Sequence, residues 1–306
     1  MTHVSKVLVT GGSGFIGSYV IERLLRDGLS VVVLDHSVPA DSERIPEVSY
    51  FLGDIRDEVA VTEAMAHVDG FIHLAGVLGT QETISNPRPA VMTNIVAGLN
   101  VLEAAAQYDV PGVNIAVGNH WENNPYSISK STVERLVHMF NDYRGTQVSI
   151  VRALNAYGPR QSVSAPYGTS KVRKIMPSFI QRALHEDDIE VYGDGSQVMD
   201  MIYVSDVADF LVDALYATAA TGFFKNPIEA GTGRNTTVLD IARQVIHHTG
   251  SGQITHLPLR PGETPGAVVK ADTSTQEILY GTGKKRLIPL EQGIAKTVAY
   301  YRKNFK

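Results

Sequence analysis

A regular alternation of short β-branched runs with longer stretches of helical periodicity is the feature that most limits how this chain can fold. The runs are apolar along their whole length, so strands formed by them must be buried on both faces. Each intervening helix must then bury its own apolar stripe against the same sheet, which predicts a parallel sheet covered on both sides. The runs lie at 7–10 (VLVT), 31–35 (VVVLD), 50–52 (YFL), 71–74 (FIHL), 113–117 (VNIAV) and 148–151 (VSIV).

The alternation loosens after about residue 152, where loops rich in Pro and Gly carry only short strand and helix patterns. No linker separates the two halves. We therefore predict a doubly wound α/β domain with a smaller α/β domain woven into it. The first domain is expected to span 1–151 and to be rejoined by about 200–217, and the second to comprise 152–199 and 218–306.

Composition narrows the possible classes of function. The 306 residues are 43% hydrophobic, which suffices for well-formed cores, and the net charge of −5 comes without the basic patch of a nucleic-acid-binding protein. The absence of cysteine excludes disulfides, thiolate metal sites and a cysteine nucleophile. The pair His247–His248 lacks a carboxylate at ligand spacing, so we expect no metal site. Without an apolar signal core or membrane-length window, the expected location is cytoplasmic.

A glycine-rich segment, GGSGFIG, follows the first run and leads into a helical stretch. Gly11, Gly14 and Gly17 recur every three residues, which lets the chain turn tightly and lets backbone N–H groups approach a pyrophosphate. The glycines alone would equally suit an ordinary tight turn. Asp35, however, ends the second run where a carboxylate accepts hydrogen bonds from an adenosine ribose, and its charge repels a 2′-phosphate. The sequence therefore favours NAD over NADP.

Further residues fall where a dinucleotide would lie on such a sheet. Asp54, after the third run, is placed to meet the adenine, although a helix N-cap would explain it equally well. The small residues that end the fourth run lie beside the crevice, or simply pack the core. The residues that we assign to the cofactor are Gly11, Ser13, Gly14, Phe15, Ile16, Gly17, Asp35, His36, Asp54, Ile55, Leu74, Ala75, Gly76, Asn94, Val117, Tyr126 and Lys130.

Tyr126 and Lys130, four residues apart in YSISK, are expected on one face of a helix. A phenol that titrates near 10 is a poor base at neutral pH, and a neighbouring ammonium stabilises the phenolate. Such a pair is common on surface helices, so it points to catalysis only because the cofactor motifs precede it.

The segments TGGSGFIG, GDIRD, HLAG, YSISK, NAYGP and VYGDGSQVMDMIYVSDVA, with Asn94 among them, follow one another in this order. They resemble the extended short-chain dehydrogenase/reductases that act on nucleotide sugars, the group that contains UDP-glucose 4-epimerase and the sugar-nucleotide dehydratases. The resemblance implies a Rossmann sheet, NAD as cofactor and a nucleotide sugar, foremost a UDP-sugar, as substrate. It also implies a homodimer, because the outer faces of two helices, here 90–107 and 127–143, form a four-helix contact in relatives.

The same resemblance implies roles for single residues. Tyr126 becomes the catalytic base or acid, while Lys130 holds the nicotinamide ribose and lowers the pKa of the tyrosine. Asn155 and Arg260 would bind the diphosphate, for which a planar guanidinium is suited. An arginine alone would more often form a surface ion pair, but its place in RPGE favours the phosphate. The residues that we assign to the substrate are Asn155, Pro177, Phe179, Tyr192, Arg260 and Glu263.

The chain departs from the family pattern after the fifth run, where relatives carry a Ser or Thr hydroxyl that shares the reacting oxygen of the substrate. The sequence here is AVGNHW, so Val117 or Gly118 takes that place. The candidates to replace the missing donor each have an alternative role in their own loop. They are Asn119, His120 and Thr80.

A second departure is Met199, where relatives commonly have an arginine beside the aspartate. Without that charge, Arg260, together with Arg173 or Lys174, would have to bind more of the diphosphate. The resemblance therefore leaves the identity of the substrate open.

We expect an enzyme whose bound NAD oxidises a sugar hydroxyl and then returns the hydride, because this requires no second substrate. A 4-epimerase, which acts through a transient 4-keto sugar, requires the fewest groups: one base, one cofactor and room for the keto sugar to turn over. A 4,6-dehydratase needs an acid/base pair where only Glu122 stands, and Glu122 also leaves a decarboxylase open. A keto-sugar reductase usually draws on NADPH, which Asp35 opposes. The missing hydroxyl leaves one alternative of another kind, a catalytically silent NAD-binding regulatory module.

Overall fold

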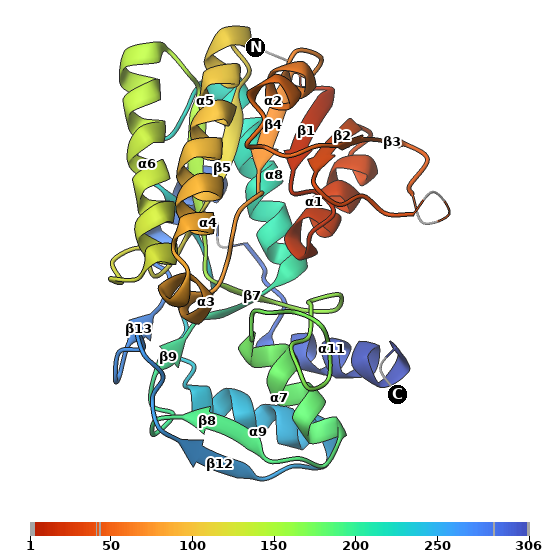
Figure 1. Ribbon diagram of the computed structural model, residues 1–306, viewed down its shortest axis with the longest axis vertical. Helices are drawn as coiled ribbons and strands as arrows, with labels where there is room; N and C mark the ends of the chain where they lie inside the picture. Colours follow the sequence, from red (N-terminus) through yellow and green to blue (C-terminus); the bar gives the residue numbers. More distant parts are fainter. Residues whose placement is uncertain (1–3, 41, 43, 284, 305–306) are drawn as a thin grey trace.

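Seven parallel strands form the main sheet of the computed structural model, which describes residues 4–40, 42, 44–283 and 285–304. The strand order β11-β6-β5-β4-β1-β2-β3 reverses at β1, as in a doubly wound sheet (Figure 1). The strands are β1 (Lys6–Thr10), β2 (Ser30–Asp35), β3 (Val48–Leu52), β4 (Gly70–His73), β5 (Gly112–Val117), β6 (Val148–Ala153) and β11 (Ile228–Ala230). The predicted fold class is confirmed.

Helices cover both faces of this sheet because its strands are apolar at successive positions. Val7 and Val9 enter the core on one face, whereas Leu8 between them enters the core on the other. One face carries α1 (Phe15–Arg26) and α8 (Val204–Thr221), and the opposite face carries α2 (Glu58–Met65), α5 (Ala97–Tyr108) and α6 (Pro125–Arg144). The sheet is thus buried between two helical layers.

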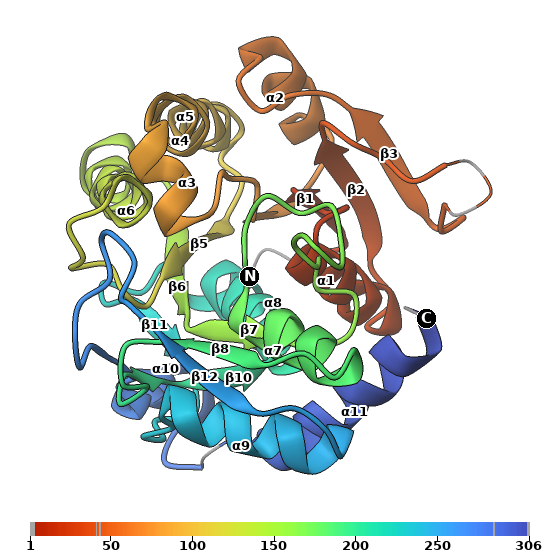
Figure 2. The same ribbon diagram turned by 60° about the horizontal axis from the view of Figure 1, so that its bottom comes forward.

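A smaller part of the molecule lies at the carboxyl ends of the strands and has its own core (Figure 2). Tyr157 and Tyr301 are fully buried in that core. Its helices are α7 (Ile175–Leu184), α9 (Val238–Thr249) and α11 (Leu290–Asn304). The strands are paired in parallel: β8 (Ile189–Tyr192) with β12 (Ile254–Leu257), β7 (Asn155–Tyr157) with β10 (Met201–Tyr203), and β9 (Val198–Met199) with β13 (Val268–Val269).

The chain passes between the two parts several times. β11 belongs to the range assigned to the second domain, yet it pairs with β6 in the main sheet. The short helices η3 (Thr273–Gln276) and α10 (Glu277–Tyr280) follow it there, and the Thr275 hydroxyl accepts a hydrogen bond of 2.9 Å from the Glu229 N–H. The main sheet therefore draws a strand from the C-terminal range, and the predicted domain boundaries stay a prediction.

The stretch Arg88–Tyr108 is the one helical stretch among the described residues that is long and apolar enough to cross a membrane by composition. Val101 and Leu102 on it are buried in the core that α2 and α6 share, as expected for a core helix. It consists of α4 (Arg88–Ala90), the π-helix η2 (Val91–Val96) and α5, and the short helix α3 (Thr80–Ser85) precedes it. Turns of π-helix are rare and frequently lie at functional sites.

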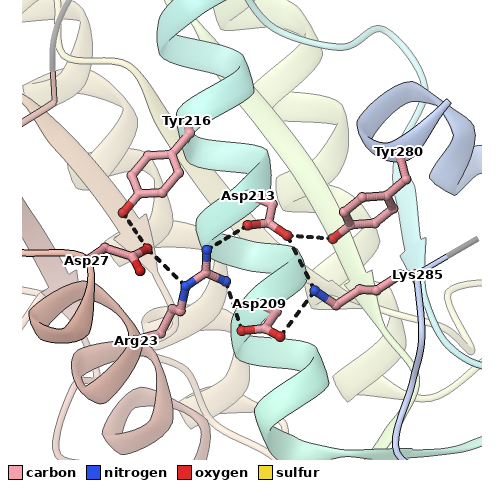
Figure 3. A network of polar contacts seen from close by, with 7 residues as sticks. All are labelled: Arg23, Asp27, Asp209, Asp213, Tyr216, Tyr280 and Lys285. Carbon is pink, nitrogen blue, oxygen red and sulfur yellow. Dashed lines mark hydrogen bonds and ion pairs between the residues drawn. The ribbon is translucent and has the colours of Figure 1, made fainter. Parts of the chain in front are cut away.

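A polar network joins α1, α8 and the segment after α10 (Figure 3). Arg23 of α1 binds Asp209 and Asp213 of α8 at 2.8 and 3.0 Å. Lys285 binds the same two carboxylates at 3.1 and 3.4 Å. Burial opposes the charge of Arg23, but the two aspartates outweigh it and raise the pKa of the guanidinium. The network therefore holds α1, and with it the glycine segment, against α8. Its other members are Asp27, Tyr216 and Tyr280.

Candidate active site

A cavity of about 860 Å³ opens between the carboxyl ends of the main strands and the smaller part. Ligands of doubly wound sheets bind at this edge, where the strand order reverses. The structure brings most of the predicted site residues into the wall of this one cavity. The predicted residues that do not line it are Ser13, Asn94, His120 and Pro177.

The glycine segment forms a close-packed turn at one end of the cavity. Gly11 has a φ of +73°, and a side chain at Gly17 would place its Cβ 2.5 Å from the Gly11 carbonyl oxygen. Only glycine fits both positions. The helix α1 then begins at Gly14 with no side chain capping its first turn. Free N–H groups and a close approach of the main chain suit a pyrophosphate, so this end fits a dinucleotide.

Asp35 is held rigidly beside the glycine turn. It is only 8% exposed, and its carboxylate accepts hydrogen bonds of 3.1 Å from the N–H groups of both Ser13 and Ser37. Ser13 thus contributes through its main chain to the position of Asp35. Asp54 also lines the cavity, where a hydrogen bond from Arg56 lowers the pKa of its carboxyl group. The N-cap of α2 is Asp57, so the capping role considered for Asp54 is not found.

The end of β4 forms the floor between the two ends of the cavity, with Leu74, Ala75 and Gly76 in its wall. Asn94, buried in the π-helix, accepts a hydrogen bond of 2.8 Å from the Val77 N–H. Its amide donates to the Ser129 hydroxyl at 2.8 Å, and that hydroxyl donates to the Tyr126 carbonyl at 2.9 Å. Asn94 therefore ties the loop after β4 to the helix that carries Tyr126.

Tyr126 and Lys130 face the cavity from the first turns of α6, which begins after the N-cap Asn124. Burial raises the pKa of Tyr126 above its usual range. Burial also lowers the pKa of Lys130 to about 8, with Glu134 acting in the opposite direction. Burial, which disfavours the phenolate, is the cause of the raised pKa of Tyr126. The lowering of that pKa by Lys130 together with a bound nicotinamide stays a prediction.

The loop after β5, AVGNHW, carries neither Ser nor Thr at the place where the family pattern has a hydroxyl. Val117 is 6% exposed, and a Cβ at Gly118 would lie 2.2 Å from Leu154 Cδ1. Asn119 lines the cavity, but its amide donates to Glu122 at 2.8 Å. His120 instead packs edge-on against Trp121, with 5.3 Å between the ring centroids.

Thr80, at the start of α3, is the third candidate donor, and it lines the cavity. Among the described residues its hydroxyl has no hydrogen-bond partner. Of the three candidates, Thr80 is therefore the one that is both in the cavity wall and free to donate to a ligand.

The residues predicted to bind the substrate surround the Tyr192 ring at the other end of the cavity. The guanidinium carbons of Arg260 and Arg173 lie 4.4 and 5.3 Å from its centroid, and Arg173 donates to the Tyr192 hydroxyl at 2.8 Å. Arg260 also binds Glu263 at 2.5 Å. Phe179 and Asn155 complete this wall, whereas the neighbouring Pro177 is buried inside α7.

Sequence reasoning missed several residues that shape the site. Asp200 is fully buried and accepts hydrogen bonds from Thr232, Gly233 and Ala271, which fixes the loops beneath the cavity. His73 is buried at the end of β4, where burial first and then Lys130 lower its pKa to about 3. The sequence signal that could have identified His73 is its place at the start of the HLAG segment. In the part of the chain described, no group of three or more His, Asp or Glu could hold a metal ion.

A family model described as "NAD dependent epimerase/dehydratase family" matches residues 7–222, and the chain belongs to this family. The chain is 30% identical to the "Putative UDP-glucose 4-epimerase" of Methanocaldococcus jannaschii, over 97% of this chain and 99% of that protein. It is 28% identical to a dTDP-glucose 4,6-dehydratase of Actinoplanes sp., over 98% of both. The family relationship predicted from the motifs is confirmed, and the relatives catalyse more than one reaction.

Solved structures of similar proteins cover nearly the whole chain. The UDP-glucose 4-epimerase of Thermus thermophilus in complex with NAD has a TM-score of 0.83 and 28% identity, over 97% of this chain and 99% of that one. The UDP-glucose 4-epimerase of Thermotoga maritima with UDP-glucose has a TM-score of 0.86 and 27% identity, over 98% and 100%. The fold is thus shared, and the NAD dependence of the family confirms the predicted cofactor.

Proposed function

We propose that this protein is an NAD-dependent nucleotide-sugar 4-epimerase that acts on a UDP-sugar. The observation that carries the proposal is that Tyr126 and Lys130 share one cavity with the glycine turn and Asp35. An acid/base pair and a dinucleotide site must be adjacent for a reaction that removes and restores a hydride. The similarity to proteins named UDP-glucose 4-epimerase supports this choice within the family.

The chain's own residues divide the work in this proposal. A bound NAD would accept a hydride from C4 of the sugar and return it to the opposite face of the same carbon. Gly11, Gly17 and Asp35 would hold it, while Tyr126 takes the proton of the 4-hydroxyl and later restores it. Because burial favours the protonated phenol, the positive charge of Lys130 is needed to make Tyr126 a base, and Lys130 keeps that charge below a pH of about 8.

The test mixes the NAD-loaded protein with a panel of UDP-glucose, UDP-galactose, UDP-glucuronic acid and dTDP-glucose. We expect transient absorbance of NADH with at least one UDP-sugar, and a product of unchanged mass that is the C4 epimer. A product lighter by water or by carbon dioxide contradicts epimerisation and assigns a dehydratase or a decarboxylase. No NADH absorbance with any member of the panel supports the silent NAD-binding module instead.

A specific observation favours the second candidate, a dehydratase or decarboxylase. Glu122 lines the cavity near Tyr126, and its carboxylate accepts hydrogen bonds from Asn119 and Asn124 at 2.8 and 3.0 Å. A carboxylate fixed beside the reacting sugar could move a second proton. For an epimerase, Glu122→Gln should leave product identity unchanged, whereas a dehydratase or decarboxylase should lose most of its turnover.

We also propose that the protein is a homodimer, and its cytoplasmic location stays a prediction. Exposed apolar side chains lie on η2 and α6, and these helices, with α5 continuing η2, would form a four-helix contact with a second copy. The exposed side chains include Val91, Met92, Val96, Ile128 and Met139, which are 38–48% exposed.

The predicted dimer can be measured by light scattering. A particle of twice the 33.2 kDa chain mass is expected, and Met139→Glu should shift it toward the single chain because a charge cannot be buried there unpaired. Ile278→Glu, a similarly exposed position on α10, is the matched control and should leave the mass unchanged. A single-chain mass for the wild type at micromolar concentrations would remove the claim.

A further inference from the structure

Lys130 is a buried cation without an ion pair of its own. It is 6% exposed, and no carboxylate oxygen of the described residues lies within 4.0 Å of its ammonium. Withdrawal from water disfavours the charged form, and burial accordingly lowers the pKa of Lys130 to about 8. The proposed function requires this charge, so the groups that stabilise the ammonium bear directly on the reaction.

A cluster of three charged side chains lies beyond Lys130 on the same side of α6. Glu134 is 5% exposed and is bound by Arg152 of β6, whose Nη2 and Nε lie 2.7 and 3.1 Å from its two carboxylate oxygens. Arg152 also binds Glu229 of β11 at 3.4 Å. The cluster Glu134–Arg152–Glu229 therefore places two carboxylates on one guanidinium, which leaves one negative charge in excess.

This excess charge lies where it can act on Lys130. Negative charge in a partly buried place is costly unless a cation balances it. Lys130 and Glu134 are four residues apart on α6, so their side chains project from the same face of the helix. The Glu134 carboxylate raises the pKa of Lys130 against the effect of burial. With Lys130 included, the two cations and two carboxylates carry no net charge.

The other titratable groups that face Lys130 do not supply this negative charge. The phenol of Tyr126, on the same helix, is kept protonated by burial, which raises its pKa. His73 at the end of β4 is neutral at physiological pH, because burial and then Lys130 lower its pKa to about 3. Glu122 lines the same cavity, but its carboxylate is engaged by two asparagine amides at 2.8 and 3.0 Å.

We propose that Glu134 and Glu229, joined by Arg152, are positioning residues that keep the Lys130 ammonium charged for proton transfer at Tyr126. The use of that charge in catalysis rests on the proposed function. Arg152 fixes the Glu134 carboxylate on the helix face that Lys130 shares. A guanidinium bound to Glu134 alone would cancel its charge, so the second carboxylate, Glu229, is what leaves the cluster negative.

The test follows the ammonium directly, by NMR of NAD-loaded protein labelled with carbon-13 at the lysine Cε. The Lys130 signal is identified by its loss in Lys130→Arg, and its shift with pH gives the midpoint at which the ammonium is half neutralised. Glu134→Gln keeps an oxygen that accepts from Arg152 and removes the charge, so the midpoint should fall by about one pH unit. Glu229→Gln lets Arg152 neutralise Glu134 and should lower the midpoint by less.

Two further variants separate the charge from the packing. Glu134→Asp keeps the charge and should leave the midpoint near that of the wild type, even if the shorter side chain lowers the Tm. The matched control is Glu103→Gln on α5, an exposed carboxylate that does not line the cavity, and it should move neither quantity.

The inference is overturned if Glu134→Gln lowers the Tm and leaves the midpoint unchanged, because Glu134 then only braces the fold. It is also overturned if Glu134→Asp moves the midpoint as far as Glu134→Gln does. Should Glu134→Gln fail to fold, Glu229→Gln decides, and an unchanged midpoint in that variant has the same consequence. The NMR readout needs no turnover, so an absence of epimerase activity would sink the proposed function without deciding what keeps Lys130 charged.

Discussion

The two ends of the cavity differ in whether the main chain or the side chains form the binding surface. At the cofactor end the main chain forms the site. A Cβ at Gly17 would lie only 2.5 Å from the Gly11 carbonyl oxygen, and main-chain N–H groups donate hydrogen bonds to the Asp35 carboxylate. At the proposed substrate end, charged side chains from separate segments form the site, and both Arg173 and Arg260 contact the Tyr192 ring. A site formed by the main chain depends little on side-chain identity, whereas a site formed by side chains changes when one of them is substituted. The substrate specificity of such a protein can therefore change while its cofactor site stays the same.

The largest expected effect comes from Tyr126, which stands where the two ends meet. Tyr126→Phe removes the only group that we assign to proton transfer, so turnover should fall by at least about 1,000-fold. NAD and UDP should still bind, because the phenylalanine ring keeps the shape of the tyrosine and the other residues assigned to the two ligands are unchanged. Tyr143→Phe on the same helix, at a side chain 82% exposed, is the matched control. If Tyr126→Phe turns over the best substrate as the wild type does, the pair in YSISK is structural and the epimerase assignment goes with it.

The next largest effect is expected at the cofactor end, on the preference for NAD over NADP. Asp35→Ala removes a ribose hydrogen-bond acceptor and the charge that repels a 2′-phosphate, so NAD should bind roughly 10- to 100-fold more weakly and NADP should lose less. Calorimetric titration with both cofactors measures the change in preference. Glu47→Ala is the control, since Glu47 is an exposed carboxylate that does not line the cavity. A wild type that binds NADP as tightly as NAD would show that our interpretation of Asp35 is wrong.

The same contrast explains what the sequence could predict. The glycine turn, Asp35 and the apolar runs each lie in a short contiguous segment, so the sequence sufficed to predict the fold and the cofactor. The pairing of Arg173 with Glu190 joins the segment before α7 to β8, so no local pattern encodes it. Arg260 and Glu263, in contrast, lie three residues apart in one loop, and the sequence left an ion pair open as one role for Arg260.

The site chemistry also depended on quantities that the sequence does not contain. The resemblance implies that Lys130 lowers the pKa of Tyr126, and only the structure shows that burial acts on this pKa in the opposite direction. Likewise, AVGNHW offered His120 as a donor, and only the folded loop shows its ring turned against Trp121.

A smaller effect is expected from pH, through Lys130. Its pKa is lowered from the usual range to about 8, so the ammonium is charged below that pH and becomes neutral above it. Turnover should therefore decline as the pH rises beyond about 8, by up to about tenfold per pH unit, because the neutral amine no longer favours the phenolate. Lys130→Arg keeps its charge and should flatten that decline in a profile of kcat against pH. An unchanged decline in this variant would assign the titration to another group.

The smallest effect concerns the donor that replaces the missing hydroxyl, and here the structure ranks the three candidates. The Thr80 hydroxyl lines the cavity uncommitted, the Asn119 amide already donates to Glu122 at 2.8 Å, and His120 lies outside the wall. A hydrogen bond to the reacting oxygen that strengthens as charge develops contributes about 1.5–3 kcal/mol, and a donor supplied from a neighbouring loop should reach only the lower part of that range. Thr80→Ala should thus slow turnover roughly tenfold, Asn119→Ala by less, and His120→Ala not at all.

Thr80→Ser serves as the control for this ranking, because it retains the hydroxyl and should retain the rate. Single-turnover NADH absorbance separates the effect on the chemical step from any effect on binding. If His120→Ala is the slowest of the three alanine variants, the loop after β5 rearranges when the sugar binds, and the substrate end is then more mobile than its ion pairs indicate. If all three variants keep the full rate, Tyr126 acts without a second donor, and the chemistry rests on the cofactor end alone.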